Sequence, residues 1–371
     1  MASVFLMTDS LNTGGSERQF SALVRALDPG LFQLHLGCLR REGPFLREIG
    51  EIREFALGGS FFTCKAQRAR FTLGGHLRSQ KILIAQSFDF YTNLMLIPTA
   101  RLAGVPIVIG SHRQLGDLLT QLQSRAQAAV FRLCDRVICN SRAAAERLLR
   151  FGLAESKLAV ISNGLPEEAF AEAPPALERR PGVLRIGLIA RMNDPVKNHA
   201  GFLRAAARLV SRFPTIEFLL VGDGPLRPNL EKIARNLGLE RQVRFLGDRR
   251  DISAILGSID ISVSFSFSES QSNVVLESMA AGVPVIASRV GGNIEIIQDR
   301  KTGILVESGD EGALAHALET LVKHPHLRAE YGKCGKRLAQ ENFRLDRIAH
   351  RYEELYRSLL EQKGTKIWQT R

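Results

Sequence analysis

The chain alternates short apolar runs with longer segments whose apolar residues recur at helical spacing. In its first half the apolar runs, which predict strands, are residues 4–7, 32–39, 81–87, 105–110, 136–139 and 157–161. The segments that predict helices are residues 17–27, 94–102, 118–133 and 142–151. Strands that alternate with helices in this way predict a mostly parallel, doubly wound α/β sheet.

A second alternating series occupies the rest of the chain. Its expected strands are residues 184–190, 216–221, 243–247, 260–265 and 284–288, and its expected helices are 200–211, 273–281, 313–323 and 345–361. Between the two series, residues 166–181 contain Pro174-Pro175 and several acids, which predicts a linker. We therefore expect two Rossmann-like domains, residues 1–165 and 182–344, that face a central cleft.

The composition agrees with this picture. A chain of 371 residues is long enough for two domains with their own cores, and 45% hydrophobic with 24% charged residues is typical of globular proteins. The N-terminus lacks a basic region followed by a long apolar core, and no stretch of about 18 apolar residues occurs. The five cysteines are scattered without a C-x-x-C pair, so neither a disulfide framework nor a zinc site is indicated. We expect a cytoplasmic protein.

The charge is unevenly distributed. Residues 1–165 carry 20 Lys+Arg and 12 Asp+Glu (net +8), residues 166–371 carry 30 and 26 (net +4), and together they give +12. No nucleic-acid motif accompanies the charge, so we expect no nucleic-acid partner. The densest basic patch mixes cations with phenylalanines: Phe61, Phe62, Lys65, Arg68, Arg70 and Phe71. Such a mixture is typical of surfaces that bind anionic membrane, although a solvated helix or loop would show it too.

Two glutamates eight residues apart mark the first candidate site. Glu269 follows the expected strand 260–265, and Glu277 lies about one turn into a helix for which Asn273 is the expected N-cap and Gly282 the stop. Both acids would lie at the carboxyl end of a parallel sheet, where such sheets bind ligands. A helix N-terminus there suits phosphate, and a carboxylate accepts hydrogen bonds from sugar hydroxyls.

Two cations follow another strand of the same half. Arg191 comes directly after the expected strand 184–190, and Lys197 precedes the helix 200–211. Both side chains would therefore lie at the same sheet edge as Glu269. An arginine fork and a lysine point charge together suit a diphosphate.

The first half offers two further candidates. Gly14 and Gly15 form a tight turn at a helix start, where a ligand can approach the backbone closely, but the turn is neither G-x-G-x-x-G nor a Walker A loop. His112 lies at the carboxyl end of the expected strand 105–110. A histidine in that position is a candidate for binding or proton transfer.

Taken in order, these motifs resemble the family-four retaining glycosyltransferases of the GT-B fold. The likeness runs nearly the whole length of the chain. The chain differs from the family pattern at Gln271-Ser272, where the family commonly has Gly and Pro or Phe. This difference leaves the identity of the transferred sugar open. The motifs are Gly14-Gly15-Ser16-Glu17-Arg18, Gly110-Ser111-His112, Asn163-Gly164, Arg191 with Lys197-Asn198, Val221-Gly222-Asp223-Gly224-Pro225, Phe245-Leu246-Gly247, Glu269-x7-Glu277, Ala281-Gly282-Val283-Pro284-Val285 and Gly291-Gly292-Asn293-Ile294-Glu295.

The resemblance implies transfer of a sugar from a UDP- or GDP-sugar with retention at the anomeric carbon. It places the donor mainly on the second domain and the acceptor on the first, with a last helix (about 345–371) packing back on the first domain. By position, the catalytic residues would be His112, Arg191, Lys197 and Glu269, and the donor-binding residues Gly14, Gly15, Asn163, Gly222, Gly247, Asn273, Val274 and Glu277. No D-x-D metal motif is present, so we expect neither metal nor cofactor.

The family also suggests a setting. The expected acceptor is a glycan or a lipid-linked glycan of bacterial cell-surface polysaccharide or lipopolysaccharide synthesis, reached from the inner face of the cell membrane by peripheral contact. The alternative is a GT-B protein that binds a sugar nucleotide without transferring the sugar, or an epimerase-like relative. Donor consumption measured with and without acceptor separates the two.

Overall fold

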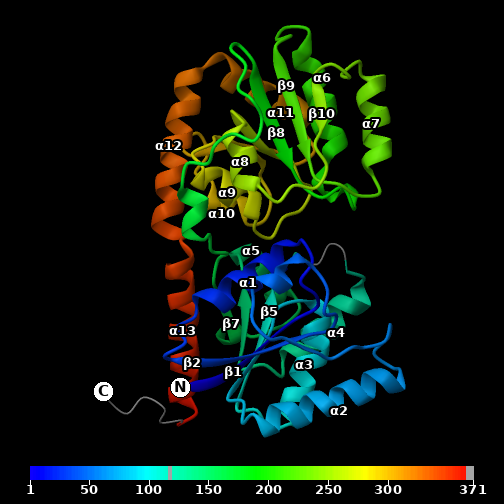
Figure 1. Ribbon diagram of the computed structural model, residues 1–371, viewed down its shortest axis with the longest axis vertical. Helices are drawn as coiled ribbons and strands as arrows, with labels where there is room; N and C mark the ends of the chain where they lie inside the picture. The colour runs from blue at the N-terminus through cyan, green and yellow to red at the C-terminus, as the bar shows by residue number, and fades with distance from the viewer. Residues whose placement is uncertain (116–118, 365–371) are drawn as a thin grey trace. The chain divides into compact units, whose positions relative to one another are not determined.

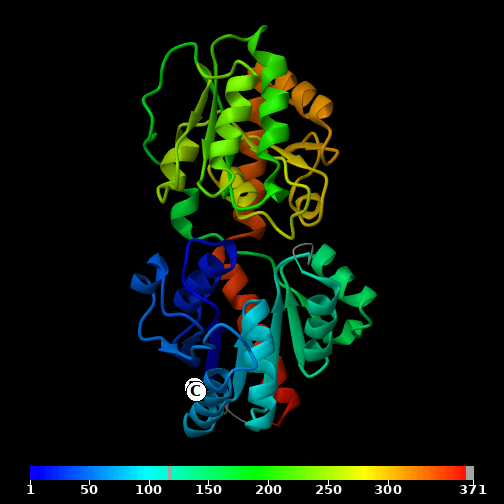
Figure 2. The same ribbon diagram turned by 90° about the vertical axis from the view of Figure 1, so that its right-hand side faces the viewer.

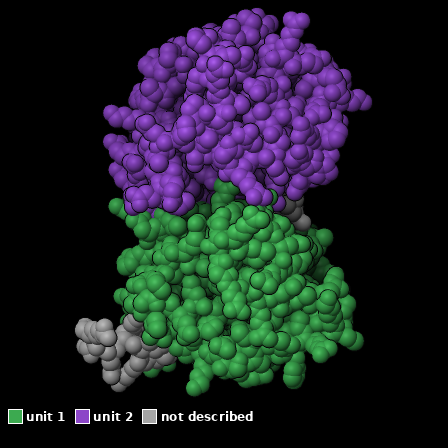
Figure 3. All heavy atoms as spheres, in the orientation of Figure 1, with its two compact units in different colours: residues 1–164, 345–371 green, residues 165–344 purple. Residues whose placement is uncertain are grey.

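The computed structural model describes residues 1–115 and 119–364. They divide into two compact units, coloured separately in Figure 3. The first unit holds residues 1–164 and the C-terminal segment from residue 345, and the second holds residues 165–344. Parts of two expected helices, residue 118 and residues 365–371, lie outside the described residues.

The first unit contains a seven-stranded parallel sheet in the order β3-β2-β1-β4-β5-β6-β7. Its strands are β1 (Ala2–Thr8), β2 (Phe32–Cys38), β3 (Arg53–Glu54), β4 (Ile84–Ser87), β5 (Ile107–His112), β6 (Arg136–Cys139) and β7 (Leu158–Val160). The chain runs outward from β1 in one direction and then returns to add β4 on the other side. This reversal makes a crevice at the carboxyl ends of β1 and β4.

Helices cover both faces of this sheet, because alternate strand residues are apolar on both sides. Val4 and Leu6 of β1 pack with one helix pair, and Phe5 and Met7 pack with the other group. The first face carries α1 (Gly15–Ala26) and α13 (Leu345–Gln362), and the second carries α2 (Cys64–Ser79), α3 (Phe90–Leu102), α4 (Gln121–Phe131) and α5 (Arg142–Arg150). Short 3-10 turns at Pro44–Arg47 and Glu155–Lys157 complete the unit.

The last helix of the chain is a structural part of this first unit. Tyr356 of α13 is fully buried, its ring meets Phe32 edge-on at 5.6 Å, and its hydroxyl donates to Oε1 of Gln86 at 2.5 Å. Figures 1 and 2 both show α13, in red, beside the blue α1. The core of the first unit is therefore built from both ends of the chain.

The second unit repeats the plan with a six-stranded parallel sheet in the order β10-β9-β8-β11-β12-β13. Its strands are β8 (Leu184–Ile189), β9 (Ile216–Val221), β10 (Val243–Phe245), β11 (Ile261–Ser264), β12 (Val285–Ser288) and β13 (Gly303–Val306). Here the reversal lies between β8 and β11, which places the crevice of this sheet beyond the carboxyl ends of those two strands.

Helices again cover both faces of the sheet. They are α6 (His199–Val210), α7 (Arg227–Asn236), α8 (Ile252–Gly257), α9 (Asn273–Ala280), α10 (Asn293–Ile296), α11 (Glu311–Lys323) and α12 (Pro325–Asn342), with 3-10 turns η3 (Glu167–Phe170) and η4 (Pro195–Lys197). Ile186 and Leu188 of β8 pack in one core with α6 and α11, while α9 and α12 form another cluster around Leu276 and Met279.

The segment expected as a linker, residues 166–181, is counted with the second unit. The Ala176 amide donates to the Ala254 carbonyl at 2.9 Å, and Arg179 forms an ion pair with Asp260 at 2.7 Å. These contacts hold the end of the segment against α8 and the start of β11. None of the described helices is both long and apolar enough to cross a membrane.

Candidate functional site

The crevice of the second sheet is lined by the loops that follow β8 and β11. The β8 loop carries Arg191, whose side chain is exposed, and ends in η4 with Lys197. Its turns are fixed locally, because Asp194 accepts a hydrogen bond from the Val196 amide at 2.9 Å. Asn198 then adopts a left-handed conformation (φ 50°) and caps α6 by accepting from the Gly201 amide at 3.1 Å. The backbone thus delivers both predicted cations to the strand end.

The β11 loop brings the predicted acid to the same place. The Phe267 amide donates to the Val196 carbonyl at 2.8 Å, which joins the two loops directly. Nζ of Lys197 forms an ion pair with Oε2 of Glu269. The Lys197 side chain is 32% exposed and that of Glu269 13%, so the pair is partly shielded from water. The structure therefore brings together two of the four residues predicted to be catalytic, and the third, Arg191, follows the same strand as Lys197.

The Glu269 loop is supported from a third strand end. The Gly292 amide, between β12 and α10, donates to the Glu269 carbonyl at 3.1 Å. A Cβ at Gly292 would lie 1.9 Å from the Ser270 carbonyl oxygen, so only glycine permits this approach. The hydroxyl of Ser266 also reaches Oε2 of Glu269 at 3.4 Å. Ser266 was missed from the sequence, because a single serine after a strand carries no distinguishing pattern.

Helix α9 begins one residue earlier than the sequence predicted, because its N-cap is Ser272 and not Asn273. Ser272 is the N-cap and accepts from the Val275 amide at 3.4 Å, so the prediction of Asn273 as N-cap is wrong. Asn273 and Val274 are instead the first two helical residues. The serine at the position where the chain departs from the family pattern therefore has a structural role. Glu277 lies one turn further along and is 9% exposed.

Two glycines allow the neighbouring strand ends to meet the Arg191 loop. Gly222 has φ 129°, and a Cβ there would lie 2.1 Å from the Ala190 carbonyl oxygen. Its amide donates to the carbonyl of Gly247 at 2.8 Å, and Gly247 itself has φ 66°. Both positions thus favour glycine for backbone reasons. His199 completes the support, with Nε2 3.3 Å from the Ala190 carbonyl, and burial lowers the pKa of its ring.

In the first unit, His112 ends β5 and is 3% exposed. Burial, together with the charge of Arg147, lowers the pKa of His112 to about 4, so the ring is neutral at physiological pH. Neither ring nitrogen has a hydrogen-bond partner within residues 1–115 and 119–364. A neutral imidazole can donate from one nitrogen and accept at the other.

The remaining first-unit predictions lie at other strand ends. Gly14 is the N-cap of α1 and Gly15 its first residue. Asn163 follows β7 and is buried, and its Oδ1 accepts from Nη2 of Arg113 at 2.5 Å. The same guanidinium reaches the Tyr352 hydroxyl at 3.2 Å, so Asn163 is tied to α13. Its predicted contact with the donor stays a prediction.

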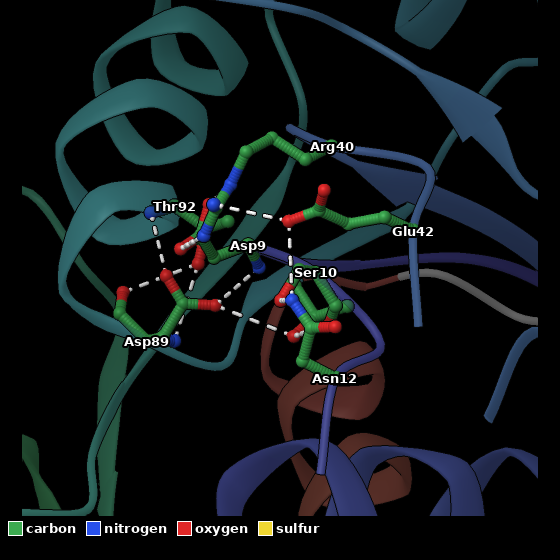
Figure 4. Close-up of polar contacts among 8 residues, drawn as sticks. Asp9, Ser10, Asn12, Arg40, Glu42, Asp89 and Thr92 are labelled. Atoms are coloured by element: carbon green, nitrogen blue, oxygen red, sulfur yellow. Dashed lines mark hydrogen bonds and ion pairs between the residues drawn. The ribbon is translucent and has the colours of Figure 1, made fainter. Parts of the chain in front are cut away.

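A polar cluster that the sequence did not indicate lies at the crevice of the first sheet (Figure 4). Asp9 follows β1, and Asp89 follows β4 and caps α3 by accepting from the Thr92 amide at 3.0 Å. Asp89 also accepts from the Asp9 amide at 2.6 Å, and Arg40 forms an ion pair with Asp9 at 2.8 Å. Burial raises the pKa of Asp89 to about 7, an effect to which the nearby charge of Asp9 adds. Glu42, Ser10 and Asn12 extend the cluster.

The described residues contain no group of three or more His, Cys, Asp or Glu side chains arranged to hold a metal ion.

Comparison with known proteins identifies the family. A model of glycosyltransferase family 4 matches residues 13–169, and a model of glycosyl transferases group 1 matches residues 183–324. The chain is 31% identical over 245 residues to the lipopolysaccharide core biosynthesis glycosyltransferase LpsE of Rhizobium meliloti (strain 1021), which covers 66% of this chain and 69% of LpsE. The chain belongs to the family-4 glycosyltransferases.

Another relative of this glycosyltransferase matches a shorter stretch. The N-acetyl-alpha-D-glucosaminyl L-malate synthase of Bacillus anthracis is 36% identical over 173 residues, which is 46% of this chain. The match spans 45% of the length of that synthase.

Solved structures show the same fold. Anabaena Alr3699/HepE in complex with UDP-glucose superposes with a TM-score of 0.84 at 19% identity, covering 96% of this chain and 100% of HepE. Sucrose-phosphate synthase from Thermosynechococcus elongatus gives a TM-score of 0.83 at 19% identity, covering 98% and 100%. The glycosyltransferase therefore has the GT-B fold of two parallel-sheet domains, which confirms the fold predicted from the sequence.

Proposed function

We propose that this glycosyltransferase takes its sugar from a UDP-sugar, or else a GDP-sugar, and transfers it with retention to a glycan or lipid-linked acceptor of cell-surface polysaccharide. The observation that carries the proposal is the Lys197–Glu269 ion pair at the crevice of the second sheet, where the loop that holds Lys197 also carries Arg191. HepE has been solved with UDP and with UDP-glucose, which favours uridine as the base. The name of LpsE favours a surface-polysaccharide acceptor.

The cations of the crevice act on the leaving group. A nucleoside diphosphate gains negative charge as the glycosidic bond breaks, and fixed cations stabilise that charge where it develops. Lys197, which pairs with Glu269 in the structure, exchanges this partner for diphosphate oxygens. Arg191 supplies a planar fork to the same oxygens. We propose that these two charges take the place of a divalent metal.

The acids of the crevice hold the uncharged parts of the donor. Once Lys197 has turned to the diphosphate, Glu269 accepts hydrogen bonds from hydroxyls of the transferred sugar. Glu277, one turn into α9, accepts from the ribose hydroxyls, while the first amides of α9, at Asn273 and Val274, face phosphate. Glycine at positions 222 and 247 leaves backbone, not side chain, beside the bound nucleotide.

The first unit acts on the acceptor side. His112 is buried and neutral, so it can hydrogen-bond a sugar hydroxyl without introducing a positive charge. Gly14 and Gly15, at the start of α1, offer backbone to a phosphate. Asn163, the last of the proposed donor-binding positions, acts through Arg113 and the turn after β7.

The proposal is tested first by donor binding. A thermal-shift panel of nucleoside diphosphates and sugar nucleotides, all with EDTA present, should raise the apparent stability with one uridine or guanosine compound. Donor consumption with and without acceptor fractions then separates transfer from simple binding or epimerisation, and NMR of the product gives its anomeric configuration. No shift with any nucleotide, or a shift that requires Mg²⁺, would contradict the proposed site.

A further inference from the structure

The outer side of α2 exposes aromatic rings between cations. The helix buries Ala66, Leu73 and Leu77 against the core of the first unit. On its opposite side, Arg68, Phe71 and Arg78 follow one another at helical spacing and are all exposed. Phe71 is 83% exposed, and Phe62, just before the helix, is 93% exposed. No other aromatic side chain among the described residues approaches these values.

An aromatic stack extends this surface from α2 to α3. The ring of Phe61 stacks on that of Tyr91, with centroids 6.2 Å apart and planes inclined by 21°. The guanidinium of Arg70 lies 5.7 Å from the centroid of Phe61, and Tyr91 is 47% exposed. We call the surface made by Phe61, Phe62, Arg68, Arg70, Phe71, Arg78 and Tyr91 the α2 face.

The charge of the α2 face is of one sign. From Phe55 to Phe88 the sequence contains three arginines and two lysines and no aspartate or glutamate, which gives a net charge of +5. None of these five cations forms an ion pair within residues 1–115 and 119–364. The cations therefore have no acidic partner within the described residues, and the rings of Phe62 and Phe71 are left largely exposed to solvent.

We propose that the α2 face docks on an anionic lipid bilayer. Aromatic rings enter the boundary between head groups and acyl chains, and lysine and arginine are attracted to anionic head groups. A second copy of the chain fits poorly, because a symmetric contact would set the same positive charges against each other. Exposed phenylalanines next to arginines that lack acidic partners therefore favour an anionic membrane as the partner.

This docking deepens the function proposed above and rests on it. Tyr91 is the second residue of α3, and Asp89 is the cap of the same helix. The end of the α2 face formed by Phe61 and Tyr91 therefore lies at the helix start that borders the crevice at the carboxyl ends of β1 and β4, where Asp9, Asp89 and Arg40 gather. A bilayer held at the α2 face presents its head groups to that crevice. The acceptor it implies is an amphiphile whose sugar head stays attached to lipid.

Sedimentation with vesicles tests the docking without any turnover. We compare phosphatidylcholine vesicles with vesicles that also contain phosphatidylglycerol, at low and high salt. The double variant Arg68→Gln/Arg78→Gln should lose about 25-fold in partitioning, at roughly five-fold per charge. The double variant Phe62→Ser/Phe71→Ser should lose about ten-fold or more for each ring. Circular dichroism and the nucleotide thermal shift show whether each variant folds.

Two matched controls come from exposed positions elsewhere. Lys232→Gln/Arg235→Gln removes two charges from α7, and Leu122→Ser removes an apolar side chain that is 78% exposed on α4. Both should bind vesicles like the unmodified protein. Equal binding by all variants, equal binding to neutral vesicles, or no binding to either vesicle would overturn the proposal. The proposal would also be overturned if inorganic phosphate, added at constant ionic strength, released the protein from the vesicles. That result would indicate a simple anion site.

The two proposals fail separately. Vesicle binding without any nucleotide shift would keep the docking surface and remove the sugar-nucleotide donor. A thermal shift with a nucleotide but no vesicle binding would keep the sugar-nucleotide donor and remove the docking surface.

Discussion

Replacing Lys197 with alanine removes one of the two cations proposed to stabilise the leaving diphosphate. Among the described residues Lys197 forms one ion pair, with Glu269, and that pair is only partly buried. The substitution therefore separates two effects that differ in size. One is the loss of an ion pair in the folded protein, and the other is the loss of charge stabilisation in the transition state.

The magnitudes favour an effect on catalysis. An ion pair with side chains 32% and 13% exposed contributes about 1 kcal/mol or less to folding, because water screens it. A cation fixed beside developing negative charge contributes roughly 2–4 kcal/mol to the barrier, which is about 30- to 1,000-fold in rate. We thus expect Lys197→Ala to lose most of its kcat while its thermal midpoint moves by only a few degrees.

The assay is steady-state release of the nucleoside diphosphate, with thermal denaturation in parallel. The matched control is Lys323→Ala on α11, because Lys323 also forms one partly exposed ion pair, with Glu319 at 2.6 Å, away from the crevice. The control should keep kcat and show a similar small change in stability. Equal kcat for both variants would refute the assignment of Lys197, and a large loss of stability in Lys197→Ala alone would refute the reasoning about screening.

Three further predictions follow from particular groups. His112→Ala removes the proposed hydrogen bond to a sugar hydroxyl and should lower kcat by about ten-fold. Because burial holds the pKa of His112 at about 4, the variant should keep any inflection that the unmodified enzyme shows near pH 6.5, and loss of that inflection would contradict a neutral ring. The pKa of Asp89 is raised from 3.8 to about 7, so the folded state binds more protons than the unfolded chain between these values and loses stability as pH rises through them. Asp89→Asn should remove up to about 1.4 kcal/mol per pH unit of that slope in urea titrations, and parallel curves would exclude this titration. Gly222→Ala places a Cβ 2.1 Å from a carbonyl oxygen and should lower the free energy of unfolding by more than about 2 kcal/mol. The control Gly238→Ala, at φ 69° with open space around it, should lower it by only about 1 kcal/mol. Equal thermal midpoints for the two variants would contradict the expected crowding at position 222.

Much of the fold could be predicted because buried parallel strands carry a strong local signal. The expected strand 32–39 and helix 313–323 agree closely with β2 (Phe32–Cys38) and α11 (Glu311–Lys323). Helix α12 was missed, because Gly332 and Gly335 interrupt its pattern. A Cβ at Gly332 would lie 2.1 Å from the Gly282 carbonyl oxygen, so tertiary packing requires the glycine that local propensity disfavours.

The two crevices differed in how well the sequence revealed them. Glu269 and Lys197 are 72 residues apart, but each lies beside recognisable glycines and belongs to a known family pattern. Asp9 and Asp89 are 80 residues apart, and only the placement of β4 beside β1 brings them together. A single aspartate after a strand has no pattern of its own. Strand order, which local periodicity does not encode, was therefore the missing information.

The return of α13 to the first unit also sets an order of assembly during synthesis. Ile348, Tyr352 and Tyr356 belong to the same core as Val4 and Phe32, so that core stays incomplete until the ribosome has made α13. Residues 165–344, by contrast, form a contiguous unit that can close as soon as it emerges. The N-terminal half, although made first, finishes last, and the apolar face of β1 and β2 that α13 covers stays exposed in the meantime. Nascent chains of this protein thus need protection at their beginning for longer than at their middle.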